Sequence, residues 1–205
     1  MSDSGIVFVV EDDPVVRHSL ALLLGTLELE VRAYGTGHEF LAAVPPDAPG
    51  CVVLDLRMPG LSGIEVQARM AERGLHLPVI FVTGHGDVPL AVEAMRGGAV
   101  DFLQKPFDGE ALLQRVREAL AANRSRRAQL QRQREASTRL SSLSRREREV
   151  LELVVAGRMN KAIAAELGIS AKTVEDHRAA IMKKTATRSV AELVKLTTGM
   201  SGSAT

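Results

Sequence analysis

Carboxylate side chains directly follow two short apolar runs of the sequence. Glu11 and Asp12 come after the run at 7–10, and Asp55 ends the run that begins at residue 51. Carboxylate oxygens are ligands that Mg²⁺ prefers in proteins. A carboxylate attacks phosphorus well only when its own charge and that of the phosphoryl donor are neutralised, which a metal ion does. These acids therefore predict a site that binds Mg²⁺ and places a phosphoryl group on a carboxylate.

A hydroxyl and an ammonium group follow two further runs. Thr83 ends the run at 79–82, and Lys105 follows the run at 102–104. Both groups can donate hydrogen bonds to the oxygens of a phosphoryl group. Taken singly, Thr83 fits an ordinary strand end and Lys105 an ordinary surface charge. Because such residues lie at the ends of four strand-like runs, a common site is favoured over four separate structural roles.

The elements that must position these residues alternate over the first 120 residues. Strand-like runs are separated by helical patterns, and capping-box patterns at 36–39 and 62–65 indicate helix starts. This alternation predicts a doubly wound, five-stranded parallel α/β sheet of flavodoxin-like order. The carboxyl ends of its strands would meet in one crevice and bring the site together. The predicted strands are 6–10, 30–34, 51–55, 79–83 and 101–104.

Residues 5–120 resemble the receiver domain of response regulators over the whole module. The resemblance implies that Asp55 is the phosphorylated residue. It also implies that Asp12, Asp55 and the Arg57 carbonyl bind Mg²⁺, assisted by Glu11. Glutamate at position 11 departs from the commonest pattern of the family. Since the longer side chain keeps the charge, we expect the activity to survive.

The same resemblance implies roles for the remaining residues of the crevice. Thr83 and Lys105 would contact the phosphoryl group. Phe102 takes the place of an aromatic residue that swings inward on activation, although it also fits a plain core position. The stretch at 83–89, together with 91–95, is similar to the FixJ-like subgroup of the family.

The charges of the chain are divided between its two halves. Residues 1–120 carry 9 Lys and Arg against 17 Asp and Glu, whereas residues 121–205 carry 17 against 8. An acidic part joined to a basic part indicates that the basic part meets a polyanion. Residues 121–140 are rich in charged helix formers. They predict a charged helical linker, with a flexible tether as the alternative.

From residue 143 onward the pattern is that of short helices. Gly168 stops one helix, and Ser170 is placed to cap a basic helix at 171–184. Two helices joined by a tight turn of this kind are typical of a helix-turn-helix. The motifs at 143–151 and 160–178 resemble a LuxR-type helix-turn-helix domain of four helices.

The resemblance places a set of residues, most of them polar, where they can contact a DNA duplex. A solvated charged face is the alternative for its basic members, but the charge balance and the helix-turn-helix pattern favour DNA. Aromatic residues are too few for stacking on single strands, so double-stranded DNA is the better target. The predicted contact residues are Asn160, Lys161, Lys172, Thr173, Glu175, Asp176, Arg178, Ala179, Lys183 and Lys184.

The sequence therefore predicts a two-component response regulator and transcription factor. We expect a receiver domain at 1–120, a linker at 121–140, an all-α DNA-binding domain at 141–200 and a disordered tail at 201–205. A sensor histidine kinase would phosphorylate Asp55, which would control homodimerisation and binding to promoter DNA. RNA polymerase is a further candidate partner.

Two other functions remain as alternatives. One is a DNA-binding regulator whose first half senses a signal without phosphorylation. The other is a phosphatase with an aspartyl nucleophile, but such an enzyme would want an acid where Arg57 stands. We expect no enzymatic activity beyond slow self-phosphorylation from small phosphodonors and autodephosphorylation.

The cysteine content and the hydropathy pattern bear on the location of the protein. Cys51 is the sole cysteine, which excludes an intramolecular disulfide and fits a buried small apolar residue. No stretch approaches the roughly 20 apolar residues needed to cross a bilayer. The N-terminus lacks the pattern of a signal peptide. We expect a cytoplasmic protein with no membrane partner.

Overall fold

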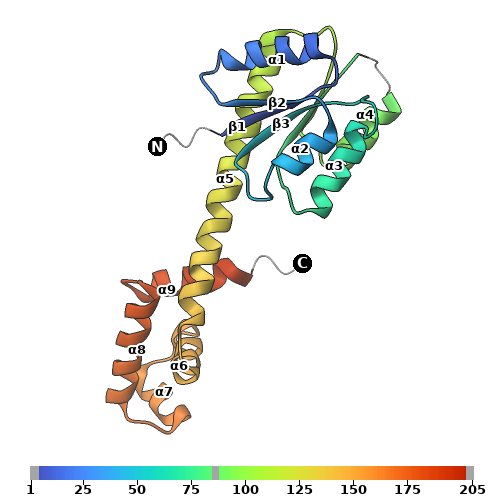
Figure 1. Cartoon of the computed structure of the whole chain (residues 1–205). Helices are drawn as coiled ribbons and strands as arrows, with labels where there is room; N and C mark the ends of the chain where they lie inside the picture. Colours follow the sequence, from blue (N-terminus) through green and yellow to red (C-terminus); the bar gives the residue numbers. More distant parts are fainter. Residues whose placement is uncertain (1–4, 85–87, 202–205) are drawn as a thin grey trace. The chain divides into compact units, whose positions relative to one another are not determined.

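The computed structural model describes residues 5–84 and 88–201 and divides the chain into two compact units (Figure 1). The first unit is Met1–Arg127 and the second is Ala128–Thr205. None of the helices within the described residues is long and apolar enough to cross a membrane.

The first unit is built on a five-stranded parallel sheet with the order β2-β1-β3-β4-β5. This order confirms the doubly wound, flavodoxin-like fold expected from the sequence. Because all strands are parallel, their carboxyl ends lie along one edge of the sheet. The strands are β1 (Ile6–Val10), β2 (Val31–Tyr34), β3 (Gly50–Asp55), β4 (Val79–Thr83) and β5 (Asp101–Gln104).

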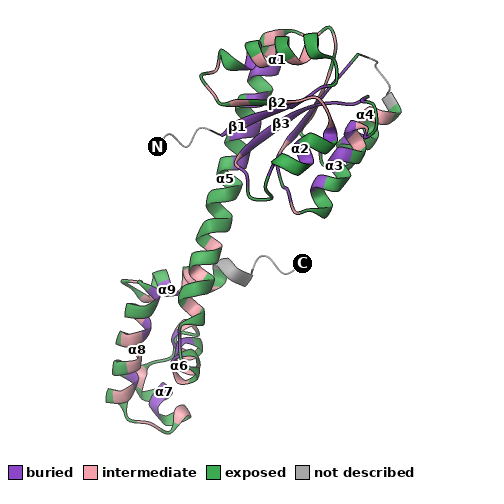
Figure 2. Cartoon of the chain, in the orientation of Figure 1, coloured by how far each residue is buried: buried purple, intermediate pink, exposed green. Residues whose placement is uncertain are grey.

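Helices cover both faces of this sheet (Figure 2). Successive residues of each strand belong to the cores on opposite faces. In β1, Phe8 packs on the side of α2, α3 and α4, whereas Val9 packs on the side of α1 and α5. Cys51 lies in the second of these cores, where burial raises the pKa of its thiol to about 12. The helices are α1 (Pro14–Gly25), α2 (Gly37–Ala43), α3 (Gly63–Glu72), α4 (Val88–Arg96) and α5 (Gly109–Ser141).

The capping patterns place two of these helices as expected, with one difference in detail. Ser62 and Glu65 form a complete capping box at the start of α3. At α2, Thr36 accepts a hydrogen bond from the Glu39 amide, but the Glu39 carboxylate accepts one from the Gly35 amide instead of the Thr36 amide. The second half of this predicted box is therefore shifted by one residue, because the preceding turn presents Gly35.

Within its described residues, the second unit contains the end of α5 and four short helices around one apolar core. Val150, Ile163, Val174 and Leu193 each come from a different helix and are almost fully buried. This arrangement confirms the all-α fold expected for this part of the chain. The helices are α6 (Arg145–Val155), α7 (Asn160–Leu167), α8 (Ala171–Thr185) and α9 (Val190–Ser201).

The turn between α7 and α8 has the predicted form. Gly168 adopts a left-handed conformation with φ of 64° at the end of α7, which glycine accepts without steric cost. Ser170 then caps α8 by accepting a hydrogen bond from the Thr173 amide. Residues 121–140, predicted as the linker, lie within α5. Of the predicted tail, Ser201 ends α9, and 202–205 lie outside the described residues.

Candidate functional site

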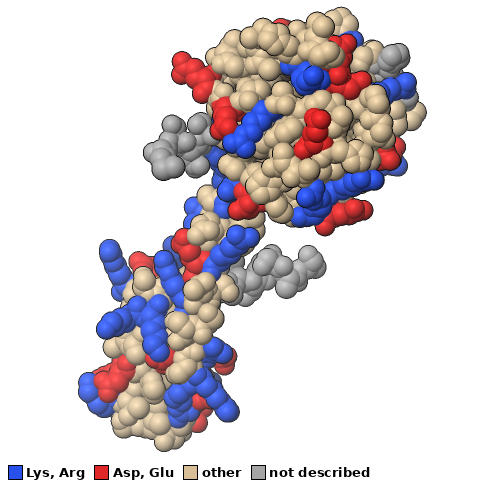
Figure 3. Space-filling model, viewed as in Figure 1, with Lys and Arg blue, Asp and Glu red and all other residues tan. Residues whose placement is uncertain are grey.

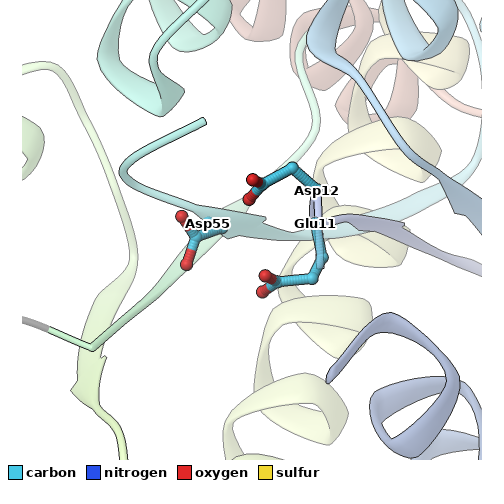
Figure 4. A group of neighbouring side chains, drawn as sticks. All are labelled: Glu11, Asp12 and Asp55. Atoms are coloured by element: carbon cyan, nitrogen blue, oxygen red, sulfur yellow. The ribbon is translucent and has the colours of Figure 1, made fainter. Parts of the chain in front are cut away.

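Three carboxylates meet where β1 and β3 end. Each of Glu11, Asp12 and Asp55 offers one ligand atom, and these atoms lie within 4.8 Å of one another. Figure 4 shows the three carboxylates pointing into the same space. Glu11 and Asp55 are 2% and 5% exposed, so their charges are held out of water. Hard oxygen ligands this close together could hold a divalent cation.

Lys105 brings the end of β5 into the same cluster. Its Nζ lies 2.6 Å from Glu11 Oε2 and 2.8 Å from Asp55 Oδ1. One ammonium group thus bridges two buried carboxylates that would otherwise repel each other. The predicted residues Glu11, Asp12, Asp55 and Lys105 are therefore brought together.

The environment raises the pKa of both partners in the Glu11–Lys105 pair. Burial is the largest cause for Glu11 and the charge of Asp55 adds to it, while the hydrogen bond from Lys105 acts in the opposite direction. Burial acts to lower the pKa of Lys105, but hydrogen bonds to Asp55 and Glu11, with their charges, outweigh it. Lys105 is therefore charged at neutral pH, and Glu11 takes up a proton more readily than an exposed glutamate.

Thr83 and Phe102 lie on the neighbouring strands. Thr83 is 1% exposed at the end of β4, and its carbonyl accepts a 2.7 Å hydrogen bond from the Lys105 amide. This bond fixes the backbone positions of the two predicted phosphoryl-contacting residues relative to each other. Phe102 is half-buried on β5 and packs against the core on the side of α2, α3 and α4.

The loop after β3 is tied to the Asp55 carboxylate. The Arg57 amide donates a 2.7 Å hydrogen bond to Asp55 Oδ2, so both oxygens of this carboxylate have partners. Gly63 then starts α3 directly against the strand end. A Cβ at this position would lie 2.3 Å from the Asp55 carbonyl oxygen. The sequence reasoning missed Gly63, although its place directly after the capping serine was a visible signal.

Arg17 is a second residue that sequence reasoning missed. Its Nη1 donates hydrogen bonds to the carbonyls of Glu11, at 2.7 Å, and Asp12, at 3.0 Å. Asp13 caps α1 and so places Arg17 one turn into the helix, beneath the loop that carries the two acids. Arg17 therefore holds the backbone of two metal-ligand candidates. An arginine four residues after a capping aspartate is a weak signal without the fold.

The predicted DNA-contacting residues belong to α7 and α8 of the second unit, and Lys and Arg side chains stand out on this unit in Figure 3. Some of them pair within the protein. Lys172 lies 3.3 Å from Asp176, and both side chains are largely exposed. Arg178 is half-buried and donates a 3.2 Å hydrogen bond to Asn160 Oδ1. Lys161, Glu175, Ala179 and Lys183 are exposed.

Lys184 connects the recognition-helix candidate to the start of α6. Its Nζ lies 2.7 Å from Glu147 Oε2, and the same carboxylate completes the capping box with Ser144. The hydrogen bond from Lys184 is the main reason that the pKa of Glu147 falls to about 2, and the Ser144 amide adds to it. Lys184 was expected to contact phosphate, and in this structure it also joins α8 to α6.

Comparison with protein families matches both units. Residues 7–117 match the response regulator receiver domain. Residues 141–197 match the bacterial regulatory proteins of the luxR family. Residues 85–87, part of the stretch similar to the FixJ-like subgroup, lie outside the described residues.

Individual relatives match over most of the chain. Nodulation protein W of Bradyrhizobium diazoefficiens is 46% identical over 95% of this chain and 86% of its own length. The transcriptional regulatory protein FixJ of Azorhizobium caulinodans is 47% identical over 96% and 93%. The solved structure of the response regulator StyR has a TM-score of 0.90 at 44% identity, covering 95% of this chain and 98% of that chain. Full-length FixJ from B. japonicum has a TM-score of 0.60 at 42% identity, covering 96% and 97%.

Proposed function

Because the chain belongs to the response regulators that combine a receiver domain with a LuxR-type DNA-binding domain, we propose that phosphorylation of Asp55 controls its binding to DNA. The single observation that carries the proposal is the contact of Asp55 with Lys105 inside the three-acid cluster. The chain is a transcription regulator by its relationship to the FixJ proteins. The proposed division places the receiver at 1–120, a linker at 121–140 and the DNA-binding domain at 141–200.

The acid cluster fits the needs of phosphoryl transfer to a carboxylate. Glu11, Asp12 and Asp55 would hold Mg²⁺, since their ligand atoms are hard oxygens within 4.8 Å of one another. The carbonyl of Arg57 would be a further ligand. When bound, the ion neutralises negative charge on the acceptor and on the donor.

The other residues of the crevice would act on the phosphoryl group once it is attached. Lys105 is charged and already donates a hydrogen bond to Asp55, so its ammonium group can donate to an oxygen of a phosphoryl group attached there. The Thr83 hydroxyl would contact a second oxygen from the adjacent strand. Phe102 is half-buried on β5 and would change its packing when Thr83 moves. Through these contacts, phosphorylation of Asp55 would change the packing of the face formed by α4 and β5.

The partners follow from the two units. A sensor histidine kinase would supply the phosphoryl group, and double-stranded promoter DNA would bind the helix-turn-helix. Phosphorylation would favour a homodimer, which places two recognition helices on one pseudo-palindromic site. The protein bound at the promoter would contact RNA polymerase. The chain itself would show slow self-phosphorylation and dephosphorylation rather than turnover of a metabolite.

The proposal is tested by incubating the full chain with phosphoramidate and Mg²⁺. We expect the intact mass to increase by one phosphoryl group, and the affinity for duplex DNA to rise. Asp55→Asn removes the nucleophile and should abolish the mass increase, whereas Asp47→Asn, outside the cluster, should retain it. Phosphorylation that persists in Asp55→Asn would assign the acceptor elsewhere. Complete lack of phosphorylation in the unaltered chain would favour a sensing domain that works without it.

A further inference from the structure

A groove of about 470 Å³ opens beside the acid cluster of the first unit. Asp12, Arg57 and Ser62 supply its polar side chains. The rest of its wall includes apolar side chains from the loop after β3, the first turn of α3 and the first turn of α4. Met58, Pro59, Ile64 and Leu90 belong to this apolar wall.

The groove is continuous with the candidate phosphoacceptor site. Asp12 belongs to both, because it lines the groove and lies with Asp55 in the acid cluster. The Arg57 amide holds Asp55 Oδ2 at 2.7 Å, so the loop that bears the apolar wall is fixed against the same carboxylate. A molecule whose phosphoryl end reaches Asp55 can therefore lay its other end along the groove.

The chemistry of the wall restricts what this other end can be. Charged and hydrogen-bonding groups dominate the cluster, which suits a phosphoryl group, whereas the apolar wall suits a hydrocarbon. Because the Ser62 hydroxyl is already engaged with Glu65, the hydroxyl groups of a sugar or a nucleoside laid against Ile64 and Leu90 would lack partners, which is unfavourable. The volume of this groove lies within the range of small-ligand sites, although the groove is open to solvent on one side.

We propose that this groove binds the hydrocarbon part of an acyl phosphate, and that it makes the chain prefer phosphodonors with longer acyl groups. The proposal rests on the proposed function of Asp55. In the transfer, a carboxylate oxygen of Asp55 forms a bond to phosphorus as the bond between phosphorus and the acyl oxygen breaks. The electron pair of that bond leaves with the acyl carboxylate, and no proton moves.

The size of the preference follows from the burial of methylene groups. Each buried methylene strengthens binding by roughly fourfold. Butyryl phosphate has two methylenes more than acetyl phosphate, which on full burial would give about fifteenfold. Because the groove is open to solvent on one side, we expect its second-order rate constant to be about tenfold larger. The two leaving carboxylates have similar basicity, so the difference reports the groove rather than the intrinsic reactivity. Phosphoramidate loses ammonia and has no acyl group, so its rate constant is independent of the groove.

The test measures phosphorylation of the full chain by intact mass with the three donors. Ile64→Ser and Leu90→Ser replace apolar wall residues by polar ones. Both should reduce the ratio of the butyryl to the acetyl rate constant toward one and keep the phosphoramidate rate. Leu29→Ser is the matched control, because Leu29 is also half-buried but lies before the amino end of β2 and packs on the side of α1 and α5, away from Ile64 and Leu90. It should keep the preference.

The outcomes separate the groove from the acceptor. A ratio near one in the unaltered chain, with normal labelling by phosphoramidate, would overturn the proposed groove and leave the role of Asp55 intact. A tenfold ratio that survives in both wall variants would also overturn it. Lack of labelling by all three donors would overturn the proposed function of Asp55 and the groove together. Because each variant is compared with its own phosphoramidate rate, loss of folding is not mistaken for loss of the preference.

Discussion

Ion pairs of the two units use the same residue types in opposite ways. In the first unit, Lys105 joins carboxylates that lie 94 and 50 residues away, and its side chain is 22% exposed. In the second unit, Lys172 pairs with Asp176 one helical turn away, and the two side chains are 76% and 66% exposed. One pair is built by the fold and shielded from water, and the other is local and solvated.

This difference decides what each charge can do. An exposed pair contributes about 0–1 kcal/mol and is screened by salt, so its lysine is free to exchange a carboxylate for a DNA phosphate. A buried cluster is costly to leave incomplete, because a charge that loses its partner stays out of water. The first unit therefore has charges suited to a chemical step, and the second has charges suited to reversible contact with a polyanion.

The largest expected effect comes from breaking the buried cluster. Lys105→Met would leave Glu11 and Asp55 side by side without their cation, and we expect a loss of about 3 kcal/mol in the free energy of unfolding. Mg²⁺ should restore part of this loss, because it would supply the missing positive charge. Urea unfolding with and without Mg²⁺ measures both effects.

The exposed pair supplies the matched control for this measurement. Lys172→Met should change the free energy of unfolding by less than about 0.5 kcal/mol and should show no dependence on Mg²⁺. Equal losses in the two variants would contradict the contrast between the units.

A smaller effect is expected when the support of the cluster is altered and its acids are kept. Arg17→Ala removes the hydrogen bonds to the carbonyls of Glu11 and Asp12. Residues that orient metal ligands in this way typically affect metal affinity by about tenfold, so Mg²⁺ binding measured by calorimetry should weaken by that factor. Arg17→Lys should recover part of the affinity.

The control here is an arginine of the same unit that touches no acid of the cluster. Arg117 pairs with Glu110 on the surface of α5, and Arg117→Ala should leave Mg²⁺ affinity unchanged. If the two alanine variants bound Mg²⁺ equally well, Arg17 would have no positioning role.

The smallest effect concerns the intermediate case, the Glu147–Lys184 pair, which is long-range and joins a buried carboxylate to a lysine whose side chain is partly exposed. The folded pKa of Glu147 is about 2, below the ordinary 4.5. A depressed pKa stabilises the folded state above about 4.5, and this contribution is lost as the pH falls toward 2. Melting of the second unit, followed by the NMR methyl signals of Ile163 and Ile181, should therefore occur at progressively lower temperature in this window.

Glu147→Gln should flatten this part of the pH dependence, because it removes the titrating group. Glu152→Gln is the control, since Glu152 lies on the same helix but its side chain is exposed. An unchanged pH profile in Glu147→Gln would show that another carboxyl group is responsible.

Local patterns in the sequence were sufficient to predict much of the fold. The apolar runs that became β1, β3, β4 and β5, the capping box at Ser62 and the turn at Gly168 all depend on neighbours within a few residues. Capping, turn formation and strand periodicity are short-range effects, so they can be recognised without knowing the tertiary structure. The chemical types of the residues at the strand ends could be predicted for the same reason.

What the sequence determined by itself was therefore the order of the elements, the residues that end each strand and the division into an acidic and a basic part. Only the tertiary structure decided which side chains touch. It placed Lys105 between Glu11 and Asp55, Arg17 beneath the acid loop and Lys184 against Glu147. It also formed the groove from three separate segments of the chain. Such contacts depend on helix packing and on the close approach of distant segments, which local residue preferences do not specify.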